Sequence, residues 1–243
     1  MYGDWLRSAT HSQGRKTHHS EETEAEKRAR NKVELAYYYQ KEYLSISYAG
    51  LTSVPTAIDK CIWLKEVNLS YNQLPLVPAV LTTLPELRKL ILGGNKITFC
   101  PSLNFLSELT YLDLHGNQLE EFPDVEHLTK LCQIDLERNQ VAMMPAYLGN
   151  LTHLDYLNLG ANKVQLVPAE LGCCTRLSYL GLRFNPIKSI PPTVYMQGTT
   201  ETLKYLREHM VENAQIEESS MRGCLKNFVN NAVSSYSHIL AHS

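Results

Sequence analysis

The sequence lacks long apolar runs, a strong net charge and a signal peptide. No run of about 18 apolar residues occurs, so we expect no transmembrane helix. The formal net charge is −2, which argues against a broadly basic nucleic-acid-binding protein. Residues 1–5 have no apolar signal core, so we do not expect secretion. The sequence also has no myristoylation start and no prenylation cysteine, so we expect no membrane insertion or lipid anchor.

The six cysteines form no C-x-x-C pair, so the usual spacing of zinc ligands is missing. No cysteine-rich segment flanks the chain's regular part, which indicates reduced thiols and a cytoplasmic protein. Cys173 and Cys174 are adjacent and are compatible with redox chemistry, but packing is the interpretation we favour. His18 and His19 have no carboxylate or cysteine neighbours, so we predict no metal site there.

Sequence signatures of phosphate loops, nucleophile elbows and zinc hydrolases are absent as well. Gly93 and Gly94 resemble a phosphate loop only out of context, because no helix is expected to start after them. We therefore predict no enzyme, no cofactor and no catalytic residues.

A repeated pattern dominates the chain. Its clearest copy is Leu109–Pro123, with the form L-x-x-L-x-L-x-x-N-x-L-x-x-φ-P, where φ is apolar. Its asparagines recur at steps of 22 or 23 residues: Asn72, Asn95, Asn117, Asn139, Asn162 and Asn185. A weaker first copy has Ala49 in place of the asparagine. A fixed period of this length is typical of a stacked-repeat solenoid, here with seven repeats over 44–197.

The alternation of leucines predicts a short strand in each repeat, and the strands should form a parallel sheet. The asparagine should bond backbone groups in the turns of neighbouring coils, which would otherwise stay unpaired inside the protein. In the 23-residue repeats, successive apolar residues after the turn are four, three and three positions apart, which favours a turn of α-helix. The 22-residue repeats use steps of three only, which favours a 3₁₀ turn.

This pattern resembles the leucine-rich repeat superfamily in its short-repeat intracellular class. The 23-residue copies are similar to Ras-suppressor and scribble-type repeats, and the 22-residue copies to phosphatase-regulating members. The resemblance covers roughly residues 44–210 and implies a right-handed α/β solenoid. Its concave face would carry a parallel β-sheet and its convex face short α or 3₁₀ turns. A fold of this kind does not name an activity.

The remaining segments are expected to cover or extend the solenoid. Residues 1–20 are polar and predict a disordered arm. Residues 21–43 predict a helix that caps the first coil, with a partner helix as the alternative. Residues 198–213 predict a second capping helix, including Leu203, Leu206 and Met210. Residues 214–243 contain an amphipathic helix over 221–240, which either folds back on the solenoid or docks into another protein.

The outward positions of the predicted strands form the candidate site. Aromatic residues there are typical anchors of protein interfaces, and acidic residues on adjacent coils form a patch that favours a basic partner surface. The predicted partner-binding residues are Tyr111, Asp113, Asp135, Glu137, Arg138, Tyr156, Asn158, Tyr179, Arg183 and Phe184. The predicted function is a non-enzymatic scaffold or adaptor that binds a protein. The alternatives are a regulatory subunit of a phosphatase or small GTPase, or a structural component of a cytoskeletal or ciliary assembly. The sequence predicts no oligomeric state.

Overall fold

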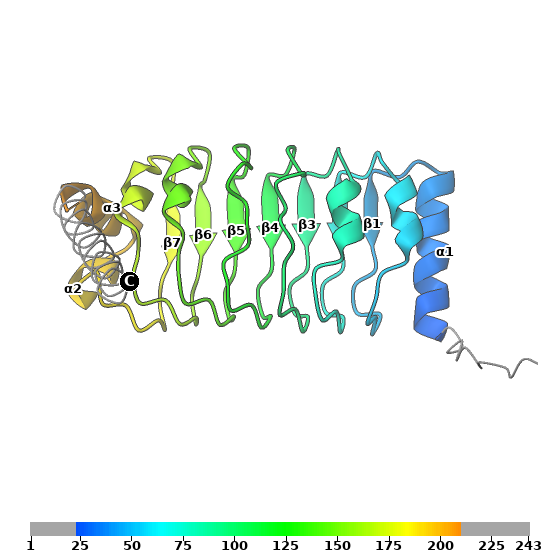
Figure 1. Ribbon diagram of the computed structural model, residues 1–243, viewed down its shortest axis with the longest axis horizontal. Helices are drawn as coiled ribbons and strands as arrows, with labels where there is room; N and C mark the ends of the chain where they lie inside the picture. The colour runs from blue at the N-terminus through cyan, green and yellow to red at the C-terminus, as the bar shows by residue number, and fades with distance from the viewer. Residues whose placement is uncertain (1–22, 210–243) are drawn as a thin grey trace, which may run out of the picture.

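The computed structural model describes residues 23–209, which form a row of stacked coils with one strand each (Figure 1). The strands pair in parallel and strictly in chain order, in one open seven-stranded sheet. They are β1 (Tyr43–Ser45), β2 (Glu66–Asn68), β3 (Lys89–Ile91), β4 (Tyr111–Asp113), β5 (Gln133–Asp135), β6 (Tyr156–Asn158) and β7 (Tyr179–Gly181). The predicted repeat solenoid with a parallel sheet is confirmed.

On the opposite face, the coils return through short 3₁₀ helices, which lie in front of the sheet in Figure 1. They are η1 (Thr56–Lys60), η2 (Ala79–Thr83), η3 (Ala146–Asn150) and η4 (Ala169–Cys173). The two 22-residue repeats return through isolated turns instead, at residues 104–108 and 126–130. We call this surface the back face.

The α-helical turn expected in the 23-residue repeats is therefore a 3₁₀ helix. In η2 the step of four from Val77 to Leu81 crosses Pro78, whose backbone is extended at ψ 117°. Only steps of three remain after the proline. The Leu81 N–H donates to the Pro78 carbonyl, and the Leu84 N–H donates to the Leu81 carbonyl. A bond between residues three apart keeps these leucines on the core side, which suits 3₁₀ geometry.

The core is a continuous apolar layer between the sheet and the back face. The pattern leucines that open each repeat are almost all fully buried, for example Leu64, Leu87 and Leu109. Because each coil buries its leucines against the coils on either side, one coil alone would leave its apolar layer open to water.

The repeat asparagines form a ladder along the core. Asn117 accepts a hydrogen bond from the Ile97 N–H at 3.0 Å. Its side-chain amide donates to the carbonyls of Leu92 in the preceding coil at 3.1 Å and of Leu114 in its own coil at 2.9 Å. Asn95, Asn139, Asn162 and Asn185 repeat this arrangement. Each asparagine thus satisfies backbone groups of the coil before it, as expected from the cost of leaving them unpaired.

This direction of bonding explains why the first repeat carries Ala49. Asn72 already serves the first coil, because it accepts from the Ala49 and Leu51 N–H groups and donates to the Ile46 carbonyl. An asparagine at position 49 would have no preceding coil to serve. Alanine avoids leaving a side-chain oxygen there without the N–H donors that a preceding coil supplies.

The first coil is covered by α1 (Glu24–Tyr38), which buries Ala29, Val33 and Ala36. Thr23 and Glu26 form a capping box at its start. Lys32 donates to the Ser45 carbonyl at 3.0 Å and so occupies an acceptor at the outer edge of β1. A helix over this edge also reduces the risk of pairing with another sheet.

At the other end lie α2 (Pro192–Tyr195) and α3 (Thr199–Glu208). Leu203 and Leu206 of α3 are buried, and Thr199 accepts a hydrogen bond from the Leu180 N–H of β7 at 2.8 Å. The predicted arm at 1–20, Met210 and the predicted tail helix at 221–240 lie outside the described residues. Within 23–209, no helix is long and apolar enough to cross a membrane.

Candidate protein-binding face

The sheet face consists of the outward side chains of the strands and the turns that follow them. Strand pairing aligns Tyr111 with Gln133 and Asp113 with Asp135, and it aligns Tyr156 with Tyr179. The same pairing sets Asp135 beside Asn158. Residues at the same outward position of successive repeats are therefore neighbours in space. Their side chains can contact one another across adjacent strands.

The residue that follows each strand's turn has a left-handed backbone conformation. Its φ lies between +54° and +69° in all seven coils, at Tyr48, Tyr71, Gly94, Gly116, Arg138, Ala161 and Phe184. Five of these seven residues carry a side chain, in a conformation that favours glycine and asparagine. The sheet face thus has a strained edge at which side chains leave the backbone in an unusual direction.

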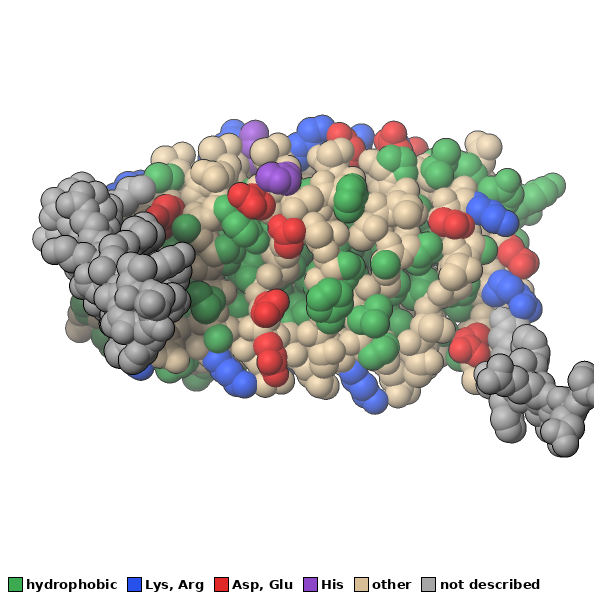
Figure 2. Space-filling view, viewed as in Figure 1, with side chains coloured by type: hydrophobic (Ala, Val, Ile, Leu, Met, Phe, Trp, Pro, Cys, Tyr) green, Lys and Arg blue, Asp and Glu red, His purple; other side chains and the backbone are tan. Residues whose placement is uncertain are grey.

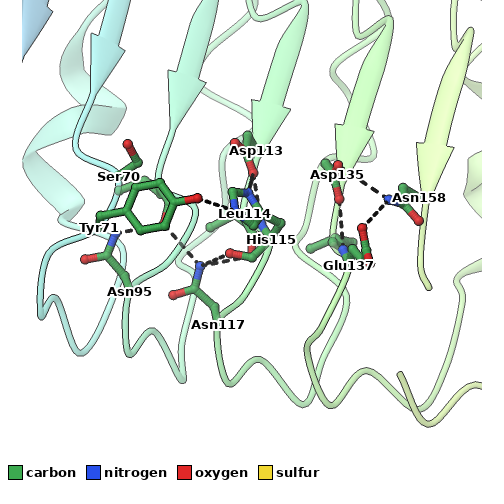
Figure 3. A network of polar contacts seen from close by, with 12 residues as sticks. Ser70, Tyr71, Asn95, Asp113, Leu114, His115, Asn117, Asp135, Glu137 and Asn158 are labelled. Atoms are coloured by element: carbon green, nitrogen blue, oxygen red, sulfur yellow. Dashed lines mark hydrogen bonds and ion pairs between the residues drawn. The ribbon is translucent and has the colours of Figure 1, made fainter. Parts of the chain in front are cut away.

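Five predicted residues join in what we call the acidic-tyrosine cluster: Asp135, Glu137, Tyr156, Asn158 and Tyr179. The Tyr156 hydroxyl donates to Asp135 Oδ2 at 3.3 Å. The Asn158 amide donates to Glu137 Oε2 at 3.1 Å and approaches Asp135 Oδ2 at 3.5 Å, as Figure 3 shows. Tyr156 and Tyr179 stack with their ring centroids 4.7 Å apart. The cluster links β5, β6 and β7.

The carboxylates of this cluster have little cationic compensation. Burial raises the pKa of Asp135, and the negative charge of Asp113 adds to the effect. Burial and the Asp135 charge also raise the pKa of Tyr156 to about 12, so its hydroxyl stays protonated as a donor. Arg138 pairs with Glu137, with its Nε 3.8 Å from Glu137 Oε1 and most of its side chain in solvent. Such exposed pairs contribute little.

Beside this cluster lies a second one, formed by Tyr48, Tyr71 and His115, which we call the aromatic-histidine cluster. His115 Nδ1 lies 2.7 Å from Asp113 Oδ1, and its Nε2 lies 3.5 Å from the Tyr71 hydroxyl (Figure 3). Tyr48 and Tyr71 stack at 4.5 Å. These aromatic residues were not among the predicted site residues.

Glycine makes room for this second cluster. A Cβ on Gly93 would lie 2.2 Å from the His115 ring, and one on Gly94 would lie 2.6 Å from the Tyr71 ring. Glycine therefore allows both rings to lie flat against the neighbouring coil. The signal in the sequence is the adjacent pair Gly93-Gly94, because the other repeats carry at most one glycine at these two positions.

Of the other four predicted residues, Asp113 contacts His115 beside the second cluster, and the remaining three lie outside both clusters. Tyr111 is covered by Lys89, whose Nζ lies 5.0 Å from the ring centroid, and burial and nearby carboxylates raise its pKa. Arg183 is exposed, and Phe184 is 86 % exposed on the coil after β7. The structure thus brings six of the ten predicted residues into contact: the acidic-tyrosine cluster and Arg138.

The arrangement offers hydrogen-bond acceptors, donors and aromatic surface on an open face. Among residues 23–209, no group of three or more His, Cys, Asp or Glu side chains is placed to hold a metal ion. The five cysteines of that range are all free thiols. Burial raises the pKa of Cys100 to about 12 and of Cys174 to about 11, so both remain protonated and unreactive at neutral pH.

Comparison with known proteins bears on the repeats and the fold. Residues 85–127 match a family model described as "Leucine Rich repeats (2 copies)". A comparison with curated protein sequences found no match.

Solved structures of leucine-rich repeat proteins are similar to this chain. One, from Leptospira interrogans, is 30% identical with a TM-score of 0.56, and the match covers 58% of this chain and 36% of that one. The ectodomain of the Arabidopsis thaliana receptor kinase GASSHO1/SCHENGEN3 is 29% identical with a TM-score of 0.52, and the match covers 56% and 17%. A Shigella effector domain shares the fold at 20% identity with a TM-score of 0.54, over 69% and 70%.

The chain thus spans much less than two thirds of the first two of these structures. What the comparisons share with it is the repeat pattern and the stacked parallel sheet, which are the features described above. The chain carries leucine-rich repeats over residues 85–127, and its fold is similar to that of solved leucine-rich repeat proteins.

Proposed function

We propose that this chain is a non-enzymatic scaffold or adaptor that binds a partner protein on its sheet face. The leucine-rich repeat fold is a general protein-interaction module, and the rigid sheet offers a surface of the usual interface size, about 800 Å² per partner. The Arabidopsis neighbour was solved in complex with CASPARIAN STRIP INTEGRITY FACTOR 2, so a fold of this kind does bind partners. The free thiols support a cytoplasmic setting for this function.

The observation that carries the proposal is the acidic-tyrosine cluster. Hydrogen bonds and stacking hold Tyr156 and Asp135 in place before a partner arrives, so little side-chain entropy is lost on binding. Tyrosines held in this way are frequent hot spots in interfaces. Burial is the main cause of the raised pKa of Asp135, and the negative charge of Asp113 beside it adds to the effect.

This charge distribution defines the partner's chemistry. Asp113, Asp135 and Glu137 lie on adjacent coils, and a lysine or arginine side chain of a partner would supply the missing positive charge. The stacked rings of Tyr156 and Tyr179 offer a π surface next to the carboxylates, which also favours a cation. The proposed partner therefore has a basic surface.

Affinity capture with the full chain as bait tests the proposal. We expect Asp135→Arg and Tyr156→Ala each to lower the amount of captured partner at least tenfold. Asp59→Arg is the matched control, because Asp59 is exposed on η1 and lies outside the sheet face. Capture that survives both sheet-face substitutions at the level of the control would refute the assignment of the binding face.

A further inference from the structure

The back face carries an exposed apolar row that the sheet-face function does not use. We call it the back row: Leu76, Phe99, Met143 and Leu166, which are 46%, 60%, 76% and 64% exposed. Each is the fourth residue after its repeat asparagine. Backbone bridges join Leu76 to Phe99 and Met143 to Leu166, so the four side chains form two adjacent pairs. Large side chains that share one exposed line often mark a binding surface.

Between the two pairs lies a groove of about 530 Å³. It is located where the two 22-residue repeats return without a 3₁₀ helix, and its apolar lining includes Phe99, Phe122 and Pro123. In the coil between the pairs, Glu121 takes the position that the back row occupies elsewhere. The row is therefore interrupted by a charge at its centre.

Glu121 belongs to a set of exposed carboxylates that we call the acidic column: Glu120, Glu121, Asp124 and Glu126. Figure 2 shows acidic side chains in a column near the middle of the back face, with hydrophobic side chains on both sides. Asp124 accepts a hydrogen bond from the neutral Asn104 side chain at 2.9 Å. The ion pairs within residues 23–209 involve other carboxylates.

The C-terminal segment of the same chain has the complementary chemistry. Residues 219–243 contain no Asp or Glu, but they include Arg222 and Lys226. Their apolar residues fall at helical spacing: Met221, Leu225, Phe228, Val229, Ala232, Val233, Tyr236, Ile239 and Leu240. An apolar stripe with two adjacent cations needs a surface that is apolar and acidic.

We propose that residues 221–240 bind to the back face of their own chain. The apolar stripe covers the back row, and Arg222 and Lys226 meet the acidic column. A helix of 20 residues is about 30 Å long, and the back row from Leu76 to Leu166 spans four coil spacings, about 19 Å.

The length of the connection allows this. The described chain ends at His209, just after α3, which packs on η4. The groove lies about two coils from η4, roughly 10 Å at the spacing of parallel strands. The 12 residues from 209 to 221 can span up to about 40 Å when extended. Covalent linkage raises the effective concentration of the segment to about the millimolar range, which favours its own chain over a second copy.

The other exposed apolar surface, around Leu35 and Tyr38 of α1, suits this segment less well. It lies at the far end of the solenoid in Figure 1, and both Glu34 and Lys60 line its groove. That groove therefore carries charges of both signs, whereas the acidic column carries four carboxylates. Distance and the number of carboxylates both favour the back row.

Zero-length carbodiimide crosslinking of the full chain tests the proposal, because it joins a lysine amine only to a carboxylate in contact with it. We expect mass spectrometry of the monomeric fraction to find Lys226 joined to the acidic column. Phe228→Asp should lower this yield at least fivefold. Asn231→Asp adds the same charge outside the apolar stripe and should leave the yield unchanged. On the back face, Phe99→Asp should act like Phe228→Asp, whereas Tyr43→Asp, at an exposed position on β1 of the sheet face, should not.

Three results would overturn the proposal. The first is a Lys226 crosslink that appears only between isotopically distinct copies, which would assign the surface to a second chain. The second is a Lys226 crosslink confined to other carboxylates. The third is a yield that Phe228→Asp and Phe99→Asp leave unchanged. Urea unfolding of each variant shows whether a lower crosslink yield arises from misfolding. Only variants that retain the stability of the parent protein are compared for yield.

Discussion

Asp113 on β4 and Asp135 on β5 are partners in the parallel register, so two carboxyl groups lie side by side on the sheet face. The His115 ring contacts the first. The second accepts hydrogen bonds from the Tyr156 hydroxyl at 3.3 Å and the Glu137 N–H at 2.9 Å. Placing like charges together costs stability, and such a cost is common where a surface serves binding.

Asp135→Asn should stabilise the folded protein at neutral pH. The folded pKa of Asp135 is raised, mainly by burial, so the folded state holds the proton more tightly than the unfolded state. The free energy of unfolding therefore falls as pH rises from about 4 through the raised folded pKa. Above that window the substitution should raise the free energy of unfolding by less than about 1 kcal/mol, because the site is partly screened by solvent.

Urea unfolding between about pH 3 and pH 7 measures this effect. The gain should vanish at the acidic end, where Asp135 is neutral in both states. Asp59→Asn, at an exposed position on η1, provides the control. A gain from Asp135→Asn that does not depend on pH would show that its cause is packing.

Asn139→Ala should cost about 1–3 kcal/mol of stability. The side chain accepts from the Leu119 N–H at 3.0 Å and donates to the Leu114 and Leu136 carbonyls. Its removal leaves the buried Leu119 N–H unpaired, at roughly 1–3 kcal/mol, while the two carbonyls each keep one partner, from Asn117 and Asn162.

The matched control for Asn139→Ala is Asn185→Ala in the last repeat. Asn185 makes the same bonds but is only partly buried, so water can replace part of the amide. We expect less than half the cost at position 185 when both variants are unfolded in urea. Equal costs would mean that the ladder contributes through packing rather than through hydrogen bonding.

Gly181→Ala should disturb the acidic-tyrosine cluster with little effect on stability. The new Cβ would lie 2.3 Å from Asn158 Oδ1, so the amide must move and its contact with Glu137 is lost. We expect a clear shift of the Asn158 side-chain amide signal in NMR spectra and a change of less than about 1 kcal/mol in stability. Gly160→Ala approaches the same oxygen only to 3.3 Å and should shift the signal much less.

Ala161→Asn should stabilise the protein. Ala161 has φ +54°, and asparagine tolerates this left-handed conformation better than alanine does. A gain of about 0.5–1 kcal/mol in the free energy of unfolding is expected. Ala142→Asn, at an exposed position outside the left-handed set, should give no gain. A thermal melt of the two variants beside the parent protein decides the comparison.

The repeat pattern predicted the strands and their register because its period leaves little freedom. Once Leu112 and Ile134 must both face the core, the pairing of Asp113 with Asp135 follows. The backbone conformation of the back-face segments, which lead from one strand to the next, was predicted less well. The spacing of four residues between apolar Val77 and Leu81 suggested a turn of α-helix. Only the extended backbone at Pro78 shows that a 3₁₀ helix follows.

The candidate site was predicted in part for a related reason. Tyr156 and Tyr179 share a strand column, so the pattern itself places them together. Tyr71 and His115 meet across two coils, over the space left by Gly93 and Gly94. A contact of that kind depends on side-chain direction at a left-handed residue, which spacing alone does not specify.

The asparagine ladder gives the solenoid a direction. The Leu74 N–H belongs to the second repeat, but it receives its side-chain acceptor from Asn95 in the third. During synthesis a coil therefore stays chemically incomplete until the ribosome has delivered the asparagine some 22 residues later. A nascent chain of this kind always carries one open coil at its growing end, and α3 closes the last one.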